Sequence, residues 1–512
     1  MTQLRFCSNP LARVAYTTEQ KTTVYFILFI LLHTLFWTLG SYFSRPSLPH
    51  DTLESITWGL QWQWGYPKHP YLTAWLCAAV FSLFNQADWS IYLLAQLVNT
   101  STFVAVWYLA KQFLPSRHAL IAVLLLEGVL FYNVNSFNLT CDSLQAPLWA
   151  CCTLFFYYAL TTEKLRHWLL TAFFAACCIC TKYQSLILFA CMLFLCLEHP
   201  NLRQNFKKKE LYYAFTFFLL LVSPHLVWLY QHQFISLVYV KTIAYDYTET
   251  KTVWGHLLYP ILTLLNDLFY IAGVFILSWP FYKKNKARFN ISPFQWHFLL
   301  IMGLGPVFIT TLLGIIDGNY FPPRWATPYF FLLGIIVIGY LKPLLNPAQL
   351  KKFSIGFVLF SSLLFGVRMV TLTLFPKPNN DAFLPNRAMA LSLSQLWQDR
   401  YHRPLAYVVG SNYLVSLITP YLPTKTKPYL NWRLKQNPWV DELELSKTGA
   451  LFIWDVGFNY AWDLEGTTTF QLPQWLFYRY PELIVLPNAT FYRLSNKAPI
   501  VIGIAILPPR EV

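Results

Sequence analysis

Apolar stretches separated by short polar connections fill the chain up to about residue 375. An α-helix needs roughly 20 apolar residues to cross a bilayer, and several of these stretches reach that length. The pattern predicts a polytopic α-helical membrane protein with about eleven transmembrane helices. The predicted spans are residues 23–43, 90–110, 119–134, 143–161, 167–181, 183–198, 211–231, 257–282, 295–316, 328–341 and 353–375.

Composition supports this interpretation. Only 12% of the residues are charged and 56% are hydrophobic, whereas soluble domains carry about 25% charged residues. The formal net charge of +15 lies in short clusters between apolar stretches rather than on one continuous basic surface. A nucleic-acid partner is therefore not expected.

The positive charges also predict the orientation of the chain. Eighteen Lys and Arg residues lie in one set of connections and six in the alternate set, and the richer set is expected in the cytoplasm. The N-terminus is then cytoplasmic. The first apolar stretch has no small-residue cleavage site and is interpreted as a retained helix.

The C-terminal segment, residues 376–512, has the composition of a soluble domain and follows the last predicted span. Ala406–Gly410 and Ala450–Val456 are predicted to be buried strands. We therefore expect a transmembrane domain at 1–375 and a small α/β or mixed extracytoplasmic domain at 376–512.

Cysteine spacing gives no indication of a metal site. All ten cysteines lie between Cys7 and Cys196, mostly in apolar stretches, and no two CxxC pairs occur at zinc spacing. No metal ligand set is predicted. Binding of a divalent cation by the acidic residues of the external connections stays open as an alternative.

The long first external connection, about residues 44–89, combines acidic, aromatic and basic side chains. Asp51 and Glu54 are three residues apart and would share one face of a helix. Trp62 offers a flat apolar surface, and Lys68 and His69 follow before an apolar stretch that is predicted to lie along the membrane interface. A solvated amphipathic helix with ordinary interfacial aromatics would show the same composition.

Three further charged residues are predicted at the outer edge of the membrane. Asp142 lies at the start of the fourth span, Lys182 between two spans and Arg324 in an external loop. The two cations would suit a lipid-linked phosphate. The alternatives are a helix-dipole charge for Asp142 and snorkelling cations for the others. The charged residues inside predicted spans are assigned no role; they are Glu127, Asp267 and Arg368.

The first external connection resembles a known family. It reads Asp51-x-x-Glu54, then Trp58-Gly59, then Gly65-Tyr66-x-Lys68-His69-Pro70-x-Leu72-x-x-Trp75-Leu76. This motif is similar to that of bacterial class C membrane glycosyltransferases that are related to protein O-mannosyltransferases. These enzymes resemble glycosyltransferase family 39. The group includes the transferase that adds 4-amino-4-deoxyarabinose to lipid A.

The resemblance implies transfer of a sugar, with inversion, from a polyprenyl-phosphate carrier to an acceptor at the outer face. Asp51 matches the acid that is the usual general base, and the segment from Lys68 to Pro70 matches one that carries a cation near the donor phosphate. Glu54 is predicted as a second catalytic residue. Many members have a second acid directly after the first, where this chain has Thr52, so the particular role of Glu54 stays open. Asp142 corresponds loosely to a second-loop acid. The other site candidates are Tyr66 and Trp62.

The implied partners are a polyprenyl-phosphate sugar donor, the lipid bilayer and an acceptor that is lipid A, another glycan or a protein. The expected location is a bacterial inner membrane with a periplasmic C-terminal domain. Two other functions stay open at this point. One is a transporter or flippase of a lipid-linked sugar, and the other is a non-catalytic envelope-assembly protein.

Overall fold

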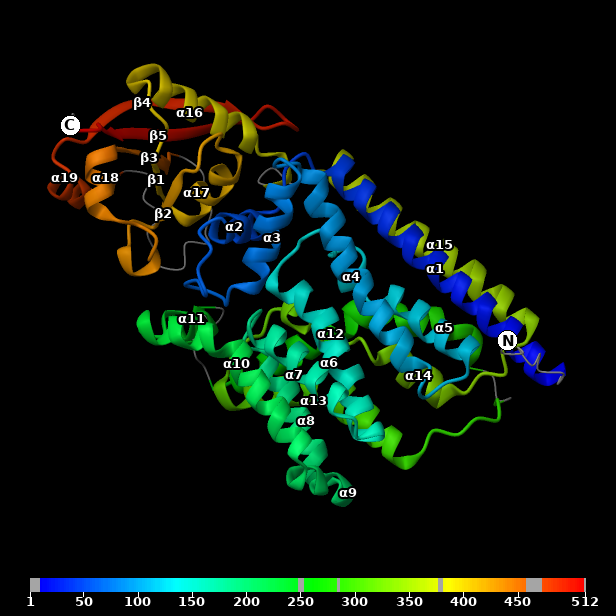
Figure 1. The fold of residues 1–512 in the computed structure, drawn as a ribbon. Helices are drawn as coiled ribbons and strands as arrows, with labels where there is room; N and C mark the ends of the chain where they lie inside the picture. The colour runs from blue at the N-terminus through cyan, green and yellow to red at the C-terminus, as the bar shows by residue number, and fades with distance from the viewer. Residues whose placement is uncertain (1–9, 247–252, 283–285, 376–380, 457–471, 511–512) are drawn as a thin grey trace, which may run out of the picture.

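The computed structural model describes residues 10–510 except 247–252, 283–285, 376–380 and 457–471, as a helical bundle followed by a small domain with a sheet (Figure 1). The helices of the bundle are α1 (Pro10–Ser44), α4 (Asp88–Ala110), α5 (Ser116–Leu124), α6 (Cys141–Thr162), α7 (Leu165–Ile179), α8 (Ser185–Glu198), α9 (Pro200–Arg203), α10 (Lys209–Gln231), α11 (Ile235–Asp246), α12 (Gly255–Ser278), α13 (Pro293–Asp317), α14 (Leu333–Leu341) and α15 (Pro347–Leu374).

A helix overlaps each of the eleven predicted spans. In the described part of the chain six of these helices, α1, α4, α10, α12, α13 and α15, are long and apolar enough to cross a membrane, and the bent pair α8–α9 raises the number to seven. The other spans contain shorter or more polar helices. For example, α14 has nine residues, and α5 has nine before two 3-10 segments, η1 (Leu125–Gly128) and η2 (Leu130–Tyr132).

Helices α1 and α15 run side by side at one edge of the bundle (Figure 1). Gly40 on α1 permits the close approach, because a Cβ there would stand 2.5 Å from Cε2 of Phe365. A larger residue at this position would require the side chain of Phe365 to move. The C-terminal ends of both helices lie at the end of the bundle where residues 44–89 begin (Figure 1).

The first external connection folds into two helices, α2 (His50–Gly59) and α3 (Leu72–Leu83). Helix α3 occupies the stretch that was predicted to lie along the interface. The two helices pack closely, since a Cβ on Gly59 would collide with the carbonyl oxygen of Ala74. This packing fixes the helix that carries Asp51.

The C-terminal domain contains a five-stranded mixed sheet in the order β2-β1-β3-β5-β4. Strand β1 is parallel to β2 and β3, and β5 is antiparallel to β3 and β4. The sheet confirms the predicted mixed domain, and the strands predicted near residues 406 and 450 are β1 and β3. The elements are α16 (Asn386–Tyr401), β1 (Tyr407–Gly410), α17 (Asn412–Ile418), β2 (Lys427–Leu430), α18 (Glu442–Thr448), β3 (Ala450–Asp455), α19 (Gln474–Arg479), β4 (Ile484–Tyr492) and β5 (Pro499–Leu507).

The C-terminal domain and the external helices share one apolar core. Leu53 and Ile56 of α2 are fully buried in the same cluster as Val415 of α17 and Trp397 of α16. Burial of side chains of this size stabilises by about 1.5–3 kcal/mol each. Helix α2 is therefore held between the bundle and the sheet domain.

A buried polar cluster joins α1, α4 and the segment η1. Nδ1 of His33 lies 3.0 Å from Oε2 of Glu127, and Nδ2 of Asn99 lies 3.1 Å from Nε2 of the same imidazole. Asn133, which begins the second external connection, donates a hydrogen bond to the backbone oxygen of Glu127. The span residue Glu127 is thus part of the packing that supports this connection.

Candidate active site

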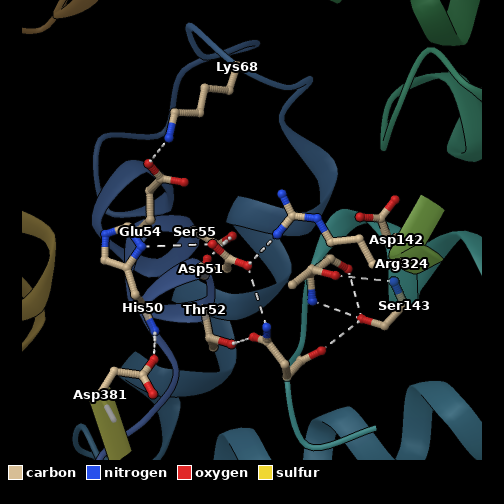
Figure 2. A network of polar contacts seen from close by, with 12 residues as sticks. His50, Asp51, Thr52, Glu54, Ser55, Lys68, Asp142, Ser143, Arg324 and Asp381 are labelled. Carbon is tan, nitrogen blue, oxygen red and sulfur yellow. Dashed lines mark hydrogen bonds and ion pairs between the residues drawn. The ribbon is translucent and has the colours of Figure 1, made fainter. Parts of the chain in front are cut away.

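Asp51 lies in the first turn of α2, where the partial positive charge of a helix N-terminus favours a carboxylate. Its side chain is 41% exposed, and Nη1 of Arg324 lies 3.5 Å from Oδ2. Nδ1 of His50 lies 3.8 Å from the other carboxylate oxygen. Figure 2 shows Arg324 reaching toward Asp51 from the opposite side of the site.

The environment keeps Asp51 ionised. Burial raises the pKa of this carboxyl, but the nearby His50 side chain and the positive charges of Arg324 and Lys68 lower it more, so the pKa lies well below its usual range. A carboxylate that is charged at neutral pH and reachable from solvent can accept a proton from a nucleophile.

Thr52 orients a further partner of Asp51. Its hydroxyl donates to Oδ1 of Asn138, and the amide nitrogen of Asn138 donates to Oδ2 of Asp51 at 3.5 Å. The position that departs from the family motif therefore fixes which end of the Asn138 amide faces the carboxylate.

Glu54 lies one helical turn after Asp51 but faces a different group of residues. It is buried, accepts a hydrogen bond from Nζ of Lys68 at 2.6 Å, and accepts another from the side chain of Asn412. Asn412 begins helix α17 of the C-terminal domain, so this contact ties the two parts of the molecule together (Figure 2 shows the pair of Glu54 and Lys68). The geometry suits a positioning role for Glu54.

Lys182 and Asp142 form the most buried ion pair of the site. Nζ of Lys182 lies 2.5 Å from Oδ1 of Asp142, and both side chains are about nine-tenths buried. The same ammonium group lies 4.6 Å from the centroid of the Trp325 ring. Trp325 neighbours Arg324 in the 3-10 segment η5 (Pro323–Ala326), so Lys182, in the turn between α7 and α8, lies next to the segment that carries Arg324.

The pKa of His69 is lowered by burial and by the nearby cations. Burial lowers the pKa of its imidazole well below the ordinary value, and the charges of Lys182, Lys68 and Arg324 lower it further. The ring is therefore neutral at pH 7. Burial also lowers the pKa of Lys68, but Glu54, Tyr239 and Asp51 together outweigh it and raise this pKa above its usual value, so Lys68 stays charged. The four predicted phosphate-binding residues thus lie in one neighbourhood, in which each of the three cations has a carboxylate partner.

The two aromatic candidates have different environments. Tyr66 is fully buried, stacks on Trp58 with ring centroids 5.7 Å apart, and its hydroxyl accepts a hydrogen bond from the backbone of Gln63. Trp62 is 53% exposed and its ring lies 5.5 Å from that of Trp75. Tyr66 therefore packs inside the loop, whereas Trp62 offers an accessible apolar surface.

Several residues of the site had not been singled out from the sequence. His50 directly precedes Asp51, and Asn138 lies in an asparagine-rich connection, so both were near predicted positions. Asn412 and Tyr239, whose ring lies 5.9 Å from Nζ of Lys68, are brought in from distant segments. Within the described residues, no three His, Cys, Asp or Glu side chains gather as a metal site would require.

Part of the chain is similar to a known protein family. Residues 68–228 match the family model described as dolichyl-phosphate-mannose-protein mannosyltransferase. The predicted resemblance is confirmed. The segment matched to the mannosyltransferase family carries Lys68, His69, Asp142 and Lys182, while Asp51 and Arg324 lie outside it.

Solved structures of a second protein share the fold of the whole chain. The crystal structure of ArnT from Cupriavidus metallidurans bound to undecaprenyl phosphate has a TM-score of 0.59, with 14% identity over 94% of this chain and 98% of that one. The structure of the same protein in the apo state has a TM-score of 0.57, with the same identity and coverage. No curated protein matches the chain. The chain therefore has the ArnT-like class C fold, including the small sheet domain.

Proposed function

We propose that this protein is a membrane glycosyltransferase that moves a sugar, with inversion, from a polyprenyl-phosphate carrier to an envelope lipid, glycan or protein. The observation that carries the proposal is the position of an ionised carboxylate, Asp51, beside Arg324 and Lys68, with His69 nearby and also under the influence of Lys182. The match of residues 68–228 to a mannosyltransferase family and the ArnT-like fold support it.

Asp51 is proposed as the general base. An acceptor hydroxyl is a poor nucleophile, and a carboxylate that takes its proton as the glycosidic bond forms contributes about 10²–10⁴-fold. The electrons of the breaking bond to the sugar go to the phosphate oxygen, so polyprenyl phosphate leaves with added negative charge. Positioned cations stabilise that charge in the transition state.

The three cations differ in how deeply their ion pairs with carboxylates are buried. Lys182 and Lys68 each have a buried carboxylate partner, whereas the ion pair between Arg324 and Asp51 is about half exposed on both sides. Exposed ion pairs stabilise by only about 0–1 kcal/mol, so Arg324 can exchange Asp51 for a phosphate at small cost. That exchange would raise the pKa of Asp51 and strengthen it as a base once the donor is bound.

Mass spectrometry of envelope glycolipids, glycans and proteins tests the function. Cells that lack this chain should lose one sugar-modified species and accumulate the unmodified acceptor, and the wild-type chain should restore the modification. Identical envelope profiles with and without the chain would contradict the proposal.

The positive-charge bias leads us to propose eleven spans, a cytoplasmic N-terminus and a periplasmic C-terminal domain. Lys435 and Lys352 are both exposed, the first in the C-terminal domain and the second on α15. A membrane-impermeant maleimide should label Lys435→Cys in intact cells and should label Lys352→Cys only after lysis. Labelling in the reverse order would place Asp51 on the cytoplasmic side and remove the basis of the proposed function.

A further inference from the structure

Two arginines meet outside the candidate active site, at the outer end of the α1–α15 pair. Arg45 follows directly after α1, and Arg368 lies in the last two turns of α15. Both guanidinium carbons lie 4.5 Å from the centroid of the Phe137 ring. Both arginines therefore contact one aromatic side chain, and they line the same small pocket, where each lies within the electrostatic influence of the other.

The pocket has more positive than negative charge. Asp381 accepts a hydrogen bond from Nη2 of Arg45 at 2.8 Å. Arg45 is 5% exposed, and its buried Nε has no hydrogen-bond partner. Among the described residues no carboxylate forms an ion pair with Arg368. Like charges brought together in a partly buried site repel, and an added anion would relieve that repulsion.

The remaining walls indicate what kind of anion fits. Trp37 of α1 and Met369 and Leu372 of α15 supply an apolar wall, and Ser41 and Ser44 supply hydroxyl groups. Both helices are long and apolar enough to cross a membrane, and many of their exposed side chains are large and apolar. A ligand with a charged group and an attached apolar chain would match both parts of the pocket.

We propose that this arginine pocket binds the phosphate group of an anionic lipid in the membrane leaflet next to the C-terminal domain. Arginine guanidinium groups bind phosphate oxygens through paired hydrogen bonds, and the acyl chains would lie along α1 and α15. The pocket is narrow, so the flexible ends of Arg368 and Met369 must move to admit the headgroup. The proposal does not depend on sugar transfer.

The pocket is also connected to the second external connection. Phe137, which touches both arginines, directly precedes Asn138, the residue that donates to Asp51. A bound lipid would restrict the motion of the Phe137 side chain and therefore of the neighbouring residue Asn138.

Native mass spectrometry of the full-length protein tests the proposal, with phosphatidylglycerol as the probe and diacylglycerol as the phosphate-free comparison. The wild type should retain phosphatidylglycerol, and Arg368→Gln should weaken this binding about tenfold, as expected for the loss of a charge-assisted hydrogen bond. Arg387→Gln is the matched control, because Arg387 also lies over an aromatic ring, that of Tyr421, but outside the pocket. It should bind like the wild type.

Equal retention of phosphatidylglycerol by Arg368→Gln and the wild type would overturn the proposal, as would equal retention of diacylglycerol. If Arg368→Gln fails to fold, Arg368→Lys is used for the same measurement, since lysine keeps the charge but cannot form the paired hydrogen bonds. A several-fold weakening supports the site, and unchanged affinity overturns it. Displacement of the lipid by millimolar inorganic phosphate would assign the pocket to free phosphate and refute the lipid proposal.

Discussion

Replacing Asp51 by asparagine is expected to lower the rate of sugar transfer by about 10²–10⁴-fold, the usual contribution of a general base. The amide has nearly the same size but cannot accept a proton at neutral pH. The effect on stability should be below about 1 kcal/mol, because the ion pair with Arg324 is half exposed. Initial rates and thermal unfolding of the purified variant would measure both effects.

Two further variants make this test specific. Asp399→Asn removes an exposed carboxylate on α16 and should leave transfer unchanged. Glu54→Gln leaves Lys68 with a weaker partner in a buried site, so it should reduce stability more than Asp51→Asn does. Full transfer by Asp51→Asn together with complete loss in a folded Glu54→Gln protein would exchange the roles of the two acids.

Replacing Arg324 by alanine is expected to raise the KM for the lipid-phosphate donor about 10–100-fold, the loss that follows removal of a charge-assisted hydrogen bond. The KM for the acceptor should change much less, because the guanidinium group is proposed to hold the leaving phosphate. Arg324→Lys should recover part of the donor affinity, since lysine keeps the positive charge but lacks the paired N–H donors of the guanidinium group.

Steady-state rates with each substrate varied in turn measure this difference. Arg387→Ala, which removes an exposed arginine beside Asp88 and away from the site, serves as the control and should leave both KM values unchanged. An equal rise in both KM values for Arg324→Ala would argue against a phosphate-binding role.

The sequence predicted the local features of the molecule well, because they depend on neighbouring residues. Apolar runs located a helix that overlaps every predicted span, and short buried apolar runs located strands β1 and β3. The number of membrane crossings is harder to obtain, since α5 and α14 are each nine residues long and their neighbours complete the apolar stretch.

The candidate site was predicted only in part. Asp51, Lys68 and His69 stood out because they lie together in one external connection, and the structure brings Lys182 and Arg324 to them. The pairing of Glu54 with Asn412 could not be predicted, because it joins residues 358 positions apart through the packing of α17 on α2. The position of Tyr66 in the core likewise depends on Trp58 and on the C-terminal domain through Trp439.

A structure of the protein with bound undecaprenyl phosphate would test the central claim most directly. We predict that the phosphate lies within hydrogen-bonding distance of at least two of Lys68, Lys182 and Arg324, and that Arg324 has moved from Asp51 to the phosphate. A phosphate bound away from all three cations, with the ion pair between Arg324 and Asp51 intact, would contradict the account.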